Sequence, residues 1–490
     1  MRRALVVLSA GLLLGGCLLG PDYKRPPLSP PATFRGEEPA AVTVAGPTFG
    51  DLQWEQLFKD EELRKLVSRA LTANYDVRIA AARVLEAQAQ LGVARAAFFP
   101  QLNVGATAGQ FQVSRTVFPY FPEKGPHGSD NFAFGGSLGF EIDLWGKIRR
   151  ANESSRALLL ASEEVKATVL SSLVADIAAA YLQLRELDLE LDIARRTLES
   201  RRASLRLVKL RKELGVSTEL EVSQAAVLVD GAAATVPDIQ RQIEQTENQI
   251  RLLLGEPPGP VIRGLPLAEQ GLTITLSPGL PSSLLERRPD IRVAEQNLIA
   301  ANANIGVAKA QMFPQLTLTA TAGQQSAALS QLMDGASGFW SFAGNLLQPV
   351  FQGGRLWFTF QATKARQQQL LVDYERTIQQ AFREVSDGLV ANQKNREVRA
   401  QNEALTAAAR EYLRLSTLQY EGGVATYLEV LDADTRLFNA EIDLARARLA
   451  VLLSVVQVYR ALGGGWQTAP VTASTEPSGE PKMVEEADRR

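Results

Sequence analysis

Residues 92–109 read GVARAAFFPQLNVGATAG, and residues 306–323 read GVAKAQMFPQLTLTATAG. Of these 18 positions, 12 are identical at an offset of 214. Downstream, RLVKLRKELGVSTELEV at 206–222 matches RLSTLQYEGGVATYLEV at 414–430 in 10 of 17 positions, at an offset of 208. A unit of about 210 residues is a duplicated domain, because solenoid repeats are only about 20–50 residues long. We therefore expect two similar halves that build one object.

Each copy of the first stretch predicts a β-hairpin. After the proline at position 100 or 314, apolar residues alternate with polar or small ones. This period-two pattern is typical of a strand with one apolar face, and such strands can cross a bilayer when tilted. We expect hairpins at about 101–145 and 315–352, with an ordinary soluble hairpin as the alternative. Aromatic residues near the strand ends suit the interfacial girdles of an outer-membrane barrel: Trp145, Phe339 and Trp340.

Four strands are too few to close a barrel. Single-chain outer-membrane barrels begin at about eight strands, and an open sheet edge is not tolerated in lipid. A chain with two membrane hairpins must therefore be an oligomer. Two copies would supply eight strands and three would supply twelve.

Very long helices are expected after each hairpin. The stretches 147–213 and 355–421 each have 67 residues without a proline, and apolar residues recur at a spacing of three to four. At about 1.5 Å per residue each would span roughly 100 Å, a length typical of coiled coils. Gly215 and Gly423 are expected to end these helices, and return helices are expected at about 218–254 and 426–462.

The remaining segments complete the domain organisation. An alanine-rich helical pattern runs from about Leu57 to Ala97 before the first hairpin. Residues 20–50 hold seven of the 24 prolines and are expected to form an extended linker across a surface. The expected units are a signal peptide (1–16), a lipidated linker (17–56), a first repeat (57–254), an inter-repeat linker (255–288), a second repeat (289–466) and a disordered tail (467–490).

Composition excludes several classes of function. The 52 Lys and Arg nearly balance the 54 Asp and Glu, so no basic footprint for nucleic acid is present. The sequence has one cysteine, Cys17, so an intramolecular disulfide is impossible. It has one histidine, His127, which makes a His/Cys metal site improbable. Residues 135–139 match the G-x-S-x-G pattern of serine hydrolases, but they lie in the middle of an alternating strand. We predict that the protein is not an enzyme and uses no cofactor or metal.

The N-terminus reads as a secretion signal. Arg2 and Arg3 precede an apolar run that is too short to span a membrane. Leu14-Gly15-Gly16-Cys17 resembles a bacterial lipobox, in which the cysteine is lipidated; a plain signal peptide is the alternative. Leu18 in place of aspartate would permit export onward to the outer membrane.

Several motifs together resemble the outer membrane factor family, the TolC-like and OprM-like channels. They are the lipobox, the two FPQL hairpin entries, RRPDI at 287–291 and the GVAT-YLEVLDA turn at 423–433. The resemblance covers nearly the whole mature chain and points to the lipoprotein branch that serves resistance-nodulation-division efflux pumps. It implies a homotrimer with a twelve-stranded β-barrel in outer-membrane lipids and a helical barrel through the periplasm. The implied partners are a periplasmic adaptor protein and an inner-membrane efflux transporter.

The resemblance also implies functional residues at the helical tip. Glu429 and Asp432 are spaced i, i+3 on one helical face, and in similar channels acidic residues there line the closed constriction. Leu428 would lie at the apolar constriction of the OprM-like branch. Tyr420 and Glu221 occupy positions that hold the tip shut in TolC-like channels. The alternative for the carboxylates is that they only complement the helix dipole.

The family resemblance implies a passive exit duct for drugs or other small molecules. Ala425 replaces an arginine found in TolC-like channels, so that form of the tip lock is not expected. Two other functions fit the same pattern of elements. One is a lipid-anchored periplasmic coiled-coil scaffold that never spans the membrane, and the other is the outer-membrane duct of a protein secretion system.

Overall fold

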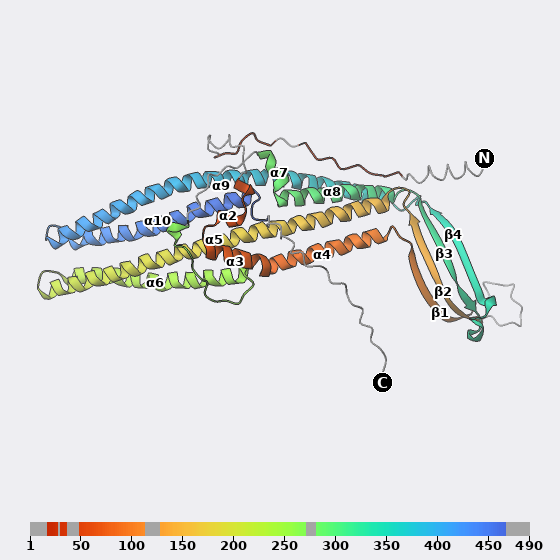
Figure 1. Ribbon diagram of the computed structural model, residues 1–490, viewed down its shortest axis with the longest axis horizontal. Helices are drawn as coiled ribbons and strands as arrows, with labels where there is room; N and C mark the ends of the chain where they lie inside the picture. Colours follow the sequence, from red (N-terminus) through yellow and green to blue (C-terminus); the bar gives the residue numbers. More distant parts are fainter. Residues whose placement is uncertain (1–16, 28–29, 37–48, 113–127, 271–280, 467–490) are drawn as a thin grey trace, which may run out of the picture.

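The computed structural model describes residues 17–27, 30–36, 49–112, 128–270 and 281–466. It shows long helices lying side by side, with a β-sheet at one end of them (Figure 1). The expected disordered tail and the signal peptide lie outside the described residues, as does His127.

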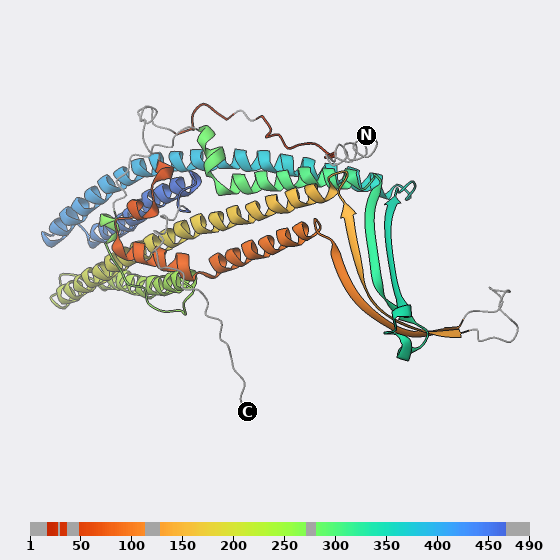
Figure 2. The ribbon, with the colours of Figure 1, turned by 45° about the vertical axis from the view of Figure 1, so that its right-hand side comes forward.

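The sheet has four antiparallel strands in chain order: β1 (Gln101–Gln112), β2 (Gly128–Ile142), β3 (Gln315–Ser326) and β4 (Gly338–Leu347). The register places Leu102, Leu138, Ala320 and Phe342 side by side, and the next row is Asn103, Ser137, Thr321 and Ser341. Because neighbouring residues of a strand point to opposite faces, one face is apolar and the other polar, as predicted. The strands bend along their length (Figure 2).

The register revises the expected aromatic girdle. Trp340 is 80% exposed and pairs with Ala322 on the apolar face. Phe339 precedes it and pairs with Gly323, so it lies on the opposite, polar face of the sheet. Trp145 follows β2, where its indole N–H donates to the Pro314 carbonyl oxygen at 2.7 Å. Trp145 therefore joins the two copies at the end of the sheet.

The long helices have the predicted bounds. They are α5 (Lys147–Glu213) and α9 (Arg355–Glu421), and the return helices are α6 (Glu219–Leu253) and α10 (Tyr427–Ala461). Gly215 and Gly423 follow α5 and α9 with φ angles of 75° and 73°. Only glycine adopts this left-handed conformation without strain, which is why both copies keep a glycine at this turn.

The helix expected at about 57–97 is divided. It consists of α3 (Glu61–Ala73) and α4 (Tyr75–Ala96), and the short α2 (Trp54–Leu57) precedes it. The Asn74 side-chain oxygen accepts from the N–H groups of Asp76 and Val77 at 2.8 and 3.1 Å. Its amide also donates to the Leu253 carbonyl oxygen at 2.8 Å. A cap with a distant tertiary partner thus ends one helix and begins the next, which apolar periodicity alone does not reveal.

Within the described residues, the helices form a layer with two edges that no further helix covers. Near the sheet, α4 packs on α5, α5 on α8 (Pro289–Ala310), and α8 on α9. Farther from the sheet, α6 packs on α5, α5 on α10, and α10 on α9. The α5–α6 and α9–α10 pairs are therefore two helical hairpins, one from each copy (Figure 1).

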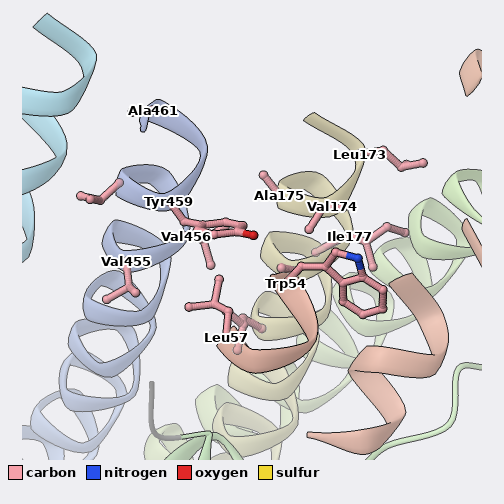
Figure 3. Close-up of a cluster of buried hydrophobic side chains, with 14 of the residues drawn as sticks. Trp54, Leu57, Leu173, Val174, Ala175, Ile177, Val455, Val456, Tyr459 and Ala461 are labelled. Atoms are coloured by element: carbon pink, nitrogen blue, oxygen red, sulfur yellow. The ribbon is translucent and has the colours of Figure 1, made fainter. Parts of the chain in front are cut away.

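An apolar core lies where the short helices cross the long ones. Trp54 and Leu57 pack between Ile177 of α5 and Tyr459 of α10 (Figure 3). Ile177 and Leu57 are 0% and 1% exposed. Within the described residues, α5 is the one helix long and apolar enough to cross a membrane, but half of that stretch is buried inside the protein, as expected of a core helix.

The RRPDI motif connects this core to the second copy. The Arg287 guanidinium pairs with Asp51 at 2.6 Å. Arg288 pairs with Asp290 and with Glu384 of α9, and it donates to the Ala461 carbonyl oxygen at 2.9 Å. Pro289 begins α8, where a missing N–H has no cost. The motif is therefore structural.

Residues 17–27 and 30–36 of the N-terminal linker lie against α5, α8 and α9. The Leu19 N–H donates to the Trp145 carbonyl oxygen at 3.1 Å. Further along, Arg25 pairs with Glu295 of α8 at 2.6 Å, and the rings of Phe34 and Phe382 lie 6.4 Å apart. The exposed Cys17 is thus held next to the junction of sheet and helices.

We predict that the buried carboxylate of Asp60 is a main stabiliser of this core. It accepts from Tyr181, Gln270 and the Leu265 N–H at 2.9, 2.6 and 2.8 Å. Burial alone would raise the pKa of Asp60, but these hydrogen bonds lower it. Asp60→Asn places an amide opposite these donors and should cost about 2 kcal/mol of unfolding free energy, measured by chemical denaturation at neutral pH.

The exposed neighbour Glu61 provides the control, since its surface pair with Lys65 contributes little. Because the pKa of Asp60 is lowered, its contribution should be complete above the unfolded carboxyl pKa and be lost as the pH falls below it. Equal stabilities of Asp60→Asn and Glu61→Gln would contradict this role.

Candidate functional site at the helical tip

The tip is the end of the helical layer farthest from the sheet, where α5 turns into α6 and α9 turns into α10 (Figure 1). Tyr420, near the end of α9, is only 6% exposed there. Its ring lies 5.2 Å from that of Tyr427, and the Arg211 guanidinium of α5 lies 4.7 Å above it. The Tyr420 and Ser217 hydroxyl oxygens are 3.4 Å apart. Tyr420 therefore connects the two helical hairpins within one chain.

The glutamates at equivalent positions of the two copies differ. In the first copy, Glu221 accepts from the Thr218 N–H while the Thr218 hydroxyl accepts from the Glu221 N–H, both at 3.3 Å. This reciprocal capping box uses the Glu221 carboxylate on its own helix. In the second copy, the Thr426 side chain makes no cap bond to the backbone, and its hydroxyl lies 3.5 Å from the Glu429 carboxylate. Glu429 is thus left exposed.

Leu428 and Asp432 are also accessible on α10. Leu428 is 62% exposed. The Asp432 carboxylate accepts from Arg436 at 2.7 Å and from the Tyr412 hydroxyl at 3.2 Å. The hydrogen bond from Arg436 lowers the pKa of Asp432. Asp432 is therefore ionised in the single chain, and its charge is partly neutralised, which the sequence prediction did not include.

A second contact between the hairpins was not predicted. Arg201 of α5 pairs with Asp434 of α10 at 2.7 Å, and its guanidinium lies 5.3 Å from the Phe438 ring centre. It also donates to the Leu228 carbonyl oxygen of α6 at 3.2 Å. The adjacent Arg202 pairs with Glu199 on its own helix. Nothing in the sequence distinguishes Arg201 from Arg202, because only the packing decides which one faces α10.

A cavity of about 150 Å³ separates the hairpins above the tip. It is lined by both apolar and polar side chains, among them Val208, Ala225, Tyr420, Tyr427 and Asp434. Burial raises the pKa of Tyr427 to about 12, so its hydroxyl stays neutral. The hairpins thus meet near the tip through a few aromatic and charged contacts around a cavity.

We predict that Arg201→Met loosens this joint. Breaking a largely buried ion pair costs about 3 kcal/mol, which corresponds to roughly 100-fold faster local opening. Amide hydrogen exchange over 428–438 should accelerate accordingly. Arg202→Met is the matched control and should leave that exchange unchanged, so equal rates in both variants would refute a joint at Arg201.

The family model described as outer membrane efflux protein matches residues 66–256 and 280–464 of the chain. The two matched segments fall on the two copies of the duplication. They cover the long helices and the strands of each copy.

Individual relatives agree over nearly full length. The chain is 36% identical over 485 residues to the toluene efflux pump outer membrane protein TtgF of Pseudomonas putida, covering 96% of this chain and all of the relative. It is 35% identical to the cation efflux system protein CusC of Escherichia coli, covering 93% and 97%. The solved outer-membrane channel OprN superimposes with a TM-score of 0.84 at 31% identity, covering 92% and 100%.

These matches confirm the predicted fold, in which a membrane sheet continues into long periplasmic helices. They also confirm the expected class of function, since the relatives are outer-membrane components of efflux pumps and none of those described is an enzyme. The chain belongs to the outer membrane efflux protein family and is the outer-membrane channel component of an efflux pump.

Proposed function

We propose that three copies of the chain form a closed duct, which an inner-membrane transporter supplies through a periplasmic adaptor. The observation that carries this proposal is that the chain has open edges at every level. β1 and β4 are exposed along their whole length. α4 and α9 are the outer helices near the sheet, and α6 and α9 are the outer helices near the tip.

Ring closure satisfies all these edges together. The β1, α4 and α6 edge of one copy would meet the β4 and α9 edge of the next. Such a head-to-tail interface generates a closed ring when the rotation closes, and a ring leaves no strand edge in lipid. An eight-stranded barrel has an interior filled by its own side chains. Three copies and twelve strands therefore suit a duct better than two copies.

The anchor and the domain organisation fit this assembly. We infer that Cys17 carries the lipid, because it is exposed and precedes Leu19, whose N–H is bonded to Trp145 beneath the sheet. The lipid would then enter the leaflet closest to the helices. The two repeats, expected at 57–254 and 289–466, would each contribute one membrane hairpin and one helical hairpin to the ring.

The tip residues would form the closed end of the duct. Three copies would bring Glu429 and Asp432 together as six carboxylates, with Leu428 as an apolar ring beside them. Tyr420 would hold the hairpins together within each copy, and Glu221 would keep the first turn in shape through its capping box. Val216 and Val424 at the two turns are 63% and 84% exposed, which offers an apolar surface to the adaptor.

The relatives bear names that refer to toluene and cation efflux. We infer a comparable role for this chain, the export of small molecules. A shared duct does not select its cargo, because selection belongs to the transporter. The secretion-duct and scaffold alternatives lack a specific supporting observation in the described structure.

The spanning barrel is tested by cysteine labelling on intact cells. Ala336→Cys lies between β3 and β4, at the end of the sheet away from the helices. It should react with a membrane-impermeant maleimide, whereas Ala407→Cys in α9 should react only after the outer membrane is permeabilised. A periplasmic scaffold would leave both cysteines unlabelled in intact cells and would refute the proposal.

The acidic tip is tested in planar bilayers. Carboxylates crowded around a pore attract divalent cations. Glu429→Ala combined with Asp432→Ala should therefore weaken Ca²⁺ block of the single-channel current about tenfold or more. Glu199→Ala, which removes an exposed carboxylate on α5, should leave the block unchanged. An unaltered block in the double variant would remove these residues from the pore.

A further inference from the structure

Two carboxylates are buried in the middle of α5. Glu186 and Glu190 lie one helical turn apart, and their residues are only 2% and 5% exposed. Residues spaced by four face the same side of a helix. Burying ionised carboxylates side by side is costly unless each finds a cation or hydrogen-bond donors.

The available partners satisfy only one of the two carboxylates. The Glu190 Oε1 accepts from Arg446 of α10 at 2.8 Å. The Glu186 Oε2 accepts from the Gln183 amide at 2.9 Å. Arg446 is therefore the one cation that balances the charge of two buried carboxyl groups in this part of the described structure. The Glu186 Oε1 is buried and has no hydrogen-bond donor.

We propose that Glu186 and Glu190 form a proton-binding site, in which one proton bridges the two carboxyl groups. The proton supplies the donor that the Glu186 Oε1 lacks and removes one of two adjacent negative charges. With the proton in place, the pair carries a single negative charge, which Arg446 balances. The described residues hold no group of three or more His, Cys, Asp or Glu that could bind a metal, which favours a proton over a cation.

The charged surroundings agree with this assignment. Burial, followed by the hydrogen bond and charge of Glu190, raises the pKa of Glu186 to about 8, while Arg446 and Gln183 act in the opposite direction. These groups come from α5 itself and from α10, one of the helices packed against it. The site should therefore hold its proton at neutral pH and release it in mildly alkaline solution.

The position of the site gives the proton a structural consequence. Below the apolar core, α5 and α10 meet along a seam that joins the two helical hairpins. Three ion pairs span this seam at 2.6–2.8 Å: Glu190–Arg446, Arg196–Glu441 and Arg201–Asp434. A small apolar cluster of Ile193, Ile442 and Ala445 lies among them. Glu186 thus lies at the upper end of a largely polar seam.

Proton release should loosen this seam. Because an ionised Glu186 must be hydrated, its ionisation favours conformations in which α5 and α10 separate locally. The sign follows from linkage: the folded chain binds more protons than the unfolded chain between the unfolded carboxyl pKa and about 8. Stability should therefore fall as the pH rises through this window. The converse also holds, since separating the hairpins would release the proton.

Thermal unfolding of the full-length protein in detergent tests the site. Between pH 6 and pH 9 the wild-type midpoint should fall by about 3 °C or more, and Glu186→Gln should lose most of this dependence. Glu199→Gln, an exposed glutamate on the same helix, should follow the wild type. An unchanged pH profile in Glu186→Gln would overturn the proposal.

Infrared difference spectra between pH 6 and pH 9 provide a second readout. A protonated carboxyl group has a C=O stretch that a carboxylate lacks, so the wild type should lose such a band at pH 9 and Glu186→Gln should not show it. Absence of the band from the wild type would also overturn the proposal. If Glu186→Gln fails to fold, Glu190→Gln provides the test. It leaves Glu186 without its carboxyl partner, so the same band should be lost.

Cation binding is the competing outcome. If Ca²⁺ at constant pH restores the alkaline midpoint in the wild type and not in Glu186→Gln, the site binds a divalent cation and the proton assignment is wrong. Insensitivity to Ca²⁺ supports the proton. None of these results depends on trimer closure, so Ala336→Cys labelling separates failure of this site from failure of the duct.

Discussion

The arrangement of the sheet and helices depends on one constraint, the need to pair backbone hydrogen-bonding groups in lipid. Four strands with one apolar face cannot stay in a bilayer while β1 and β4 keep free edges. The helices carry the same two edges toward the tip, because α4 and α6 continue on one side and α9 on the other. The proposed ring would therefore satisfy the edges of the sheet and of the helical layer together.

The contacts between the two helical hairpins change in character along their length. Around Ile177 and Tyr459 the core is apolar, and large side chains are fully buried. Toward the tip, α5 and α10 are joined by ion pairs and a small apolar cluster, and Arg211 of α5 lies over the Tyr420 ring of α9. Apolar packing is dense and resists shear, whereas charged contacts can exchange with water. The two hairpins are therefore held together more firmly at the core than at the tip.

The two copies form similar helical hairpins that differ in local contacts at their turns. Glu221 and Glu429 occupy equivalent positions, but only Glu221 completes a capping box. The first-copy return helix contains Pro237, and its counterpart α10 contains neither proline nor glycine. The missing capping box thus leaves Glu429 exposed at the start of α10, which is the more regular of the two return helices. The two carboxylates cannot be assigned different roles from the repeat alone.

The sequence by itself determined the elements whose periodicity is long and uninterrupted. The bounds of α5 and α9, the alternating strands and the glycine turns follow from apolar spacing and from the lack of proline, which are local properties. Tertiary structure decided the break at Asn74, the facing of Arg201 rather than Arg202 and the burial of Glu186 beside Glu190. Each of these depends on a partner distant in the chain, because a side chain's surroundings are set by what packs against it.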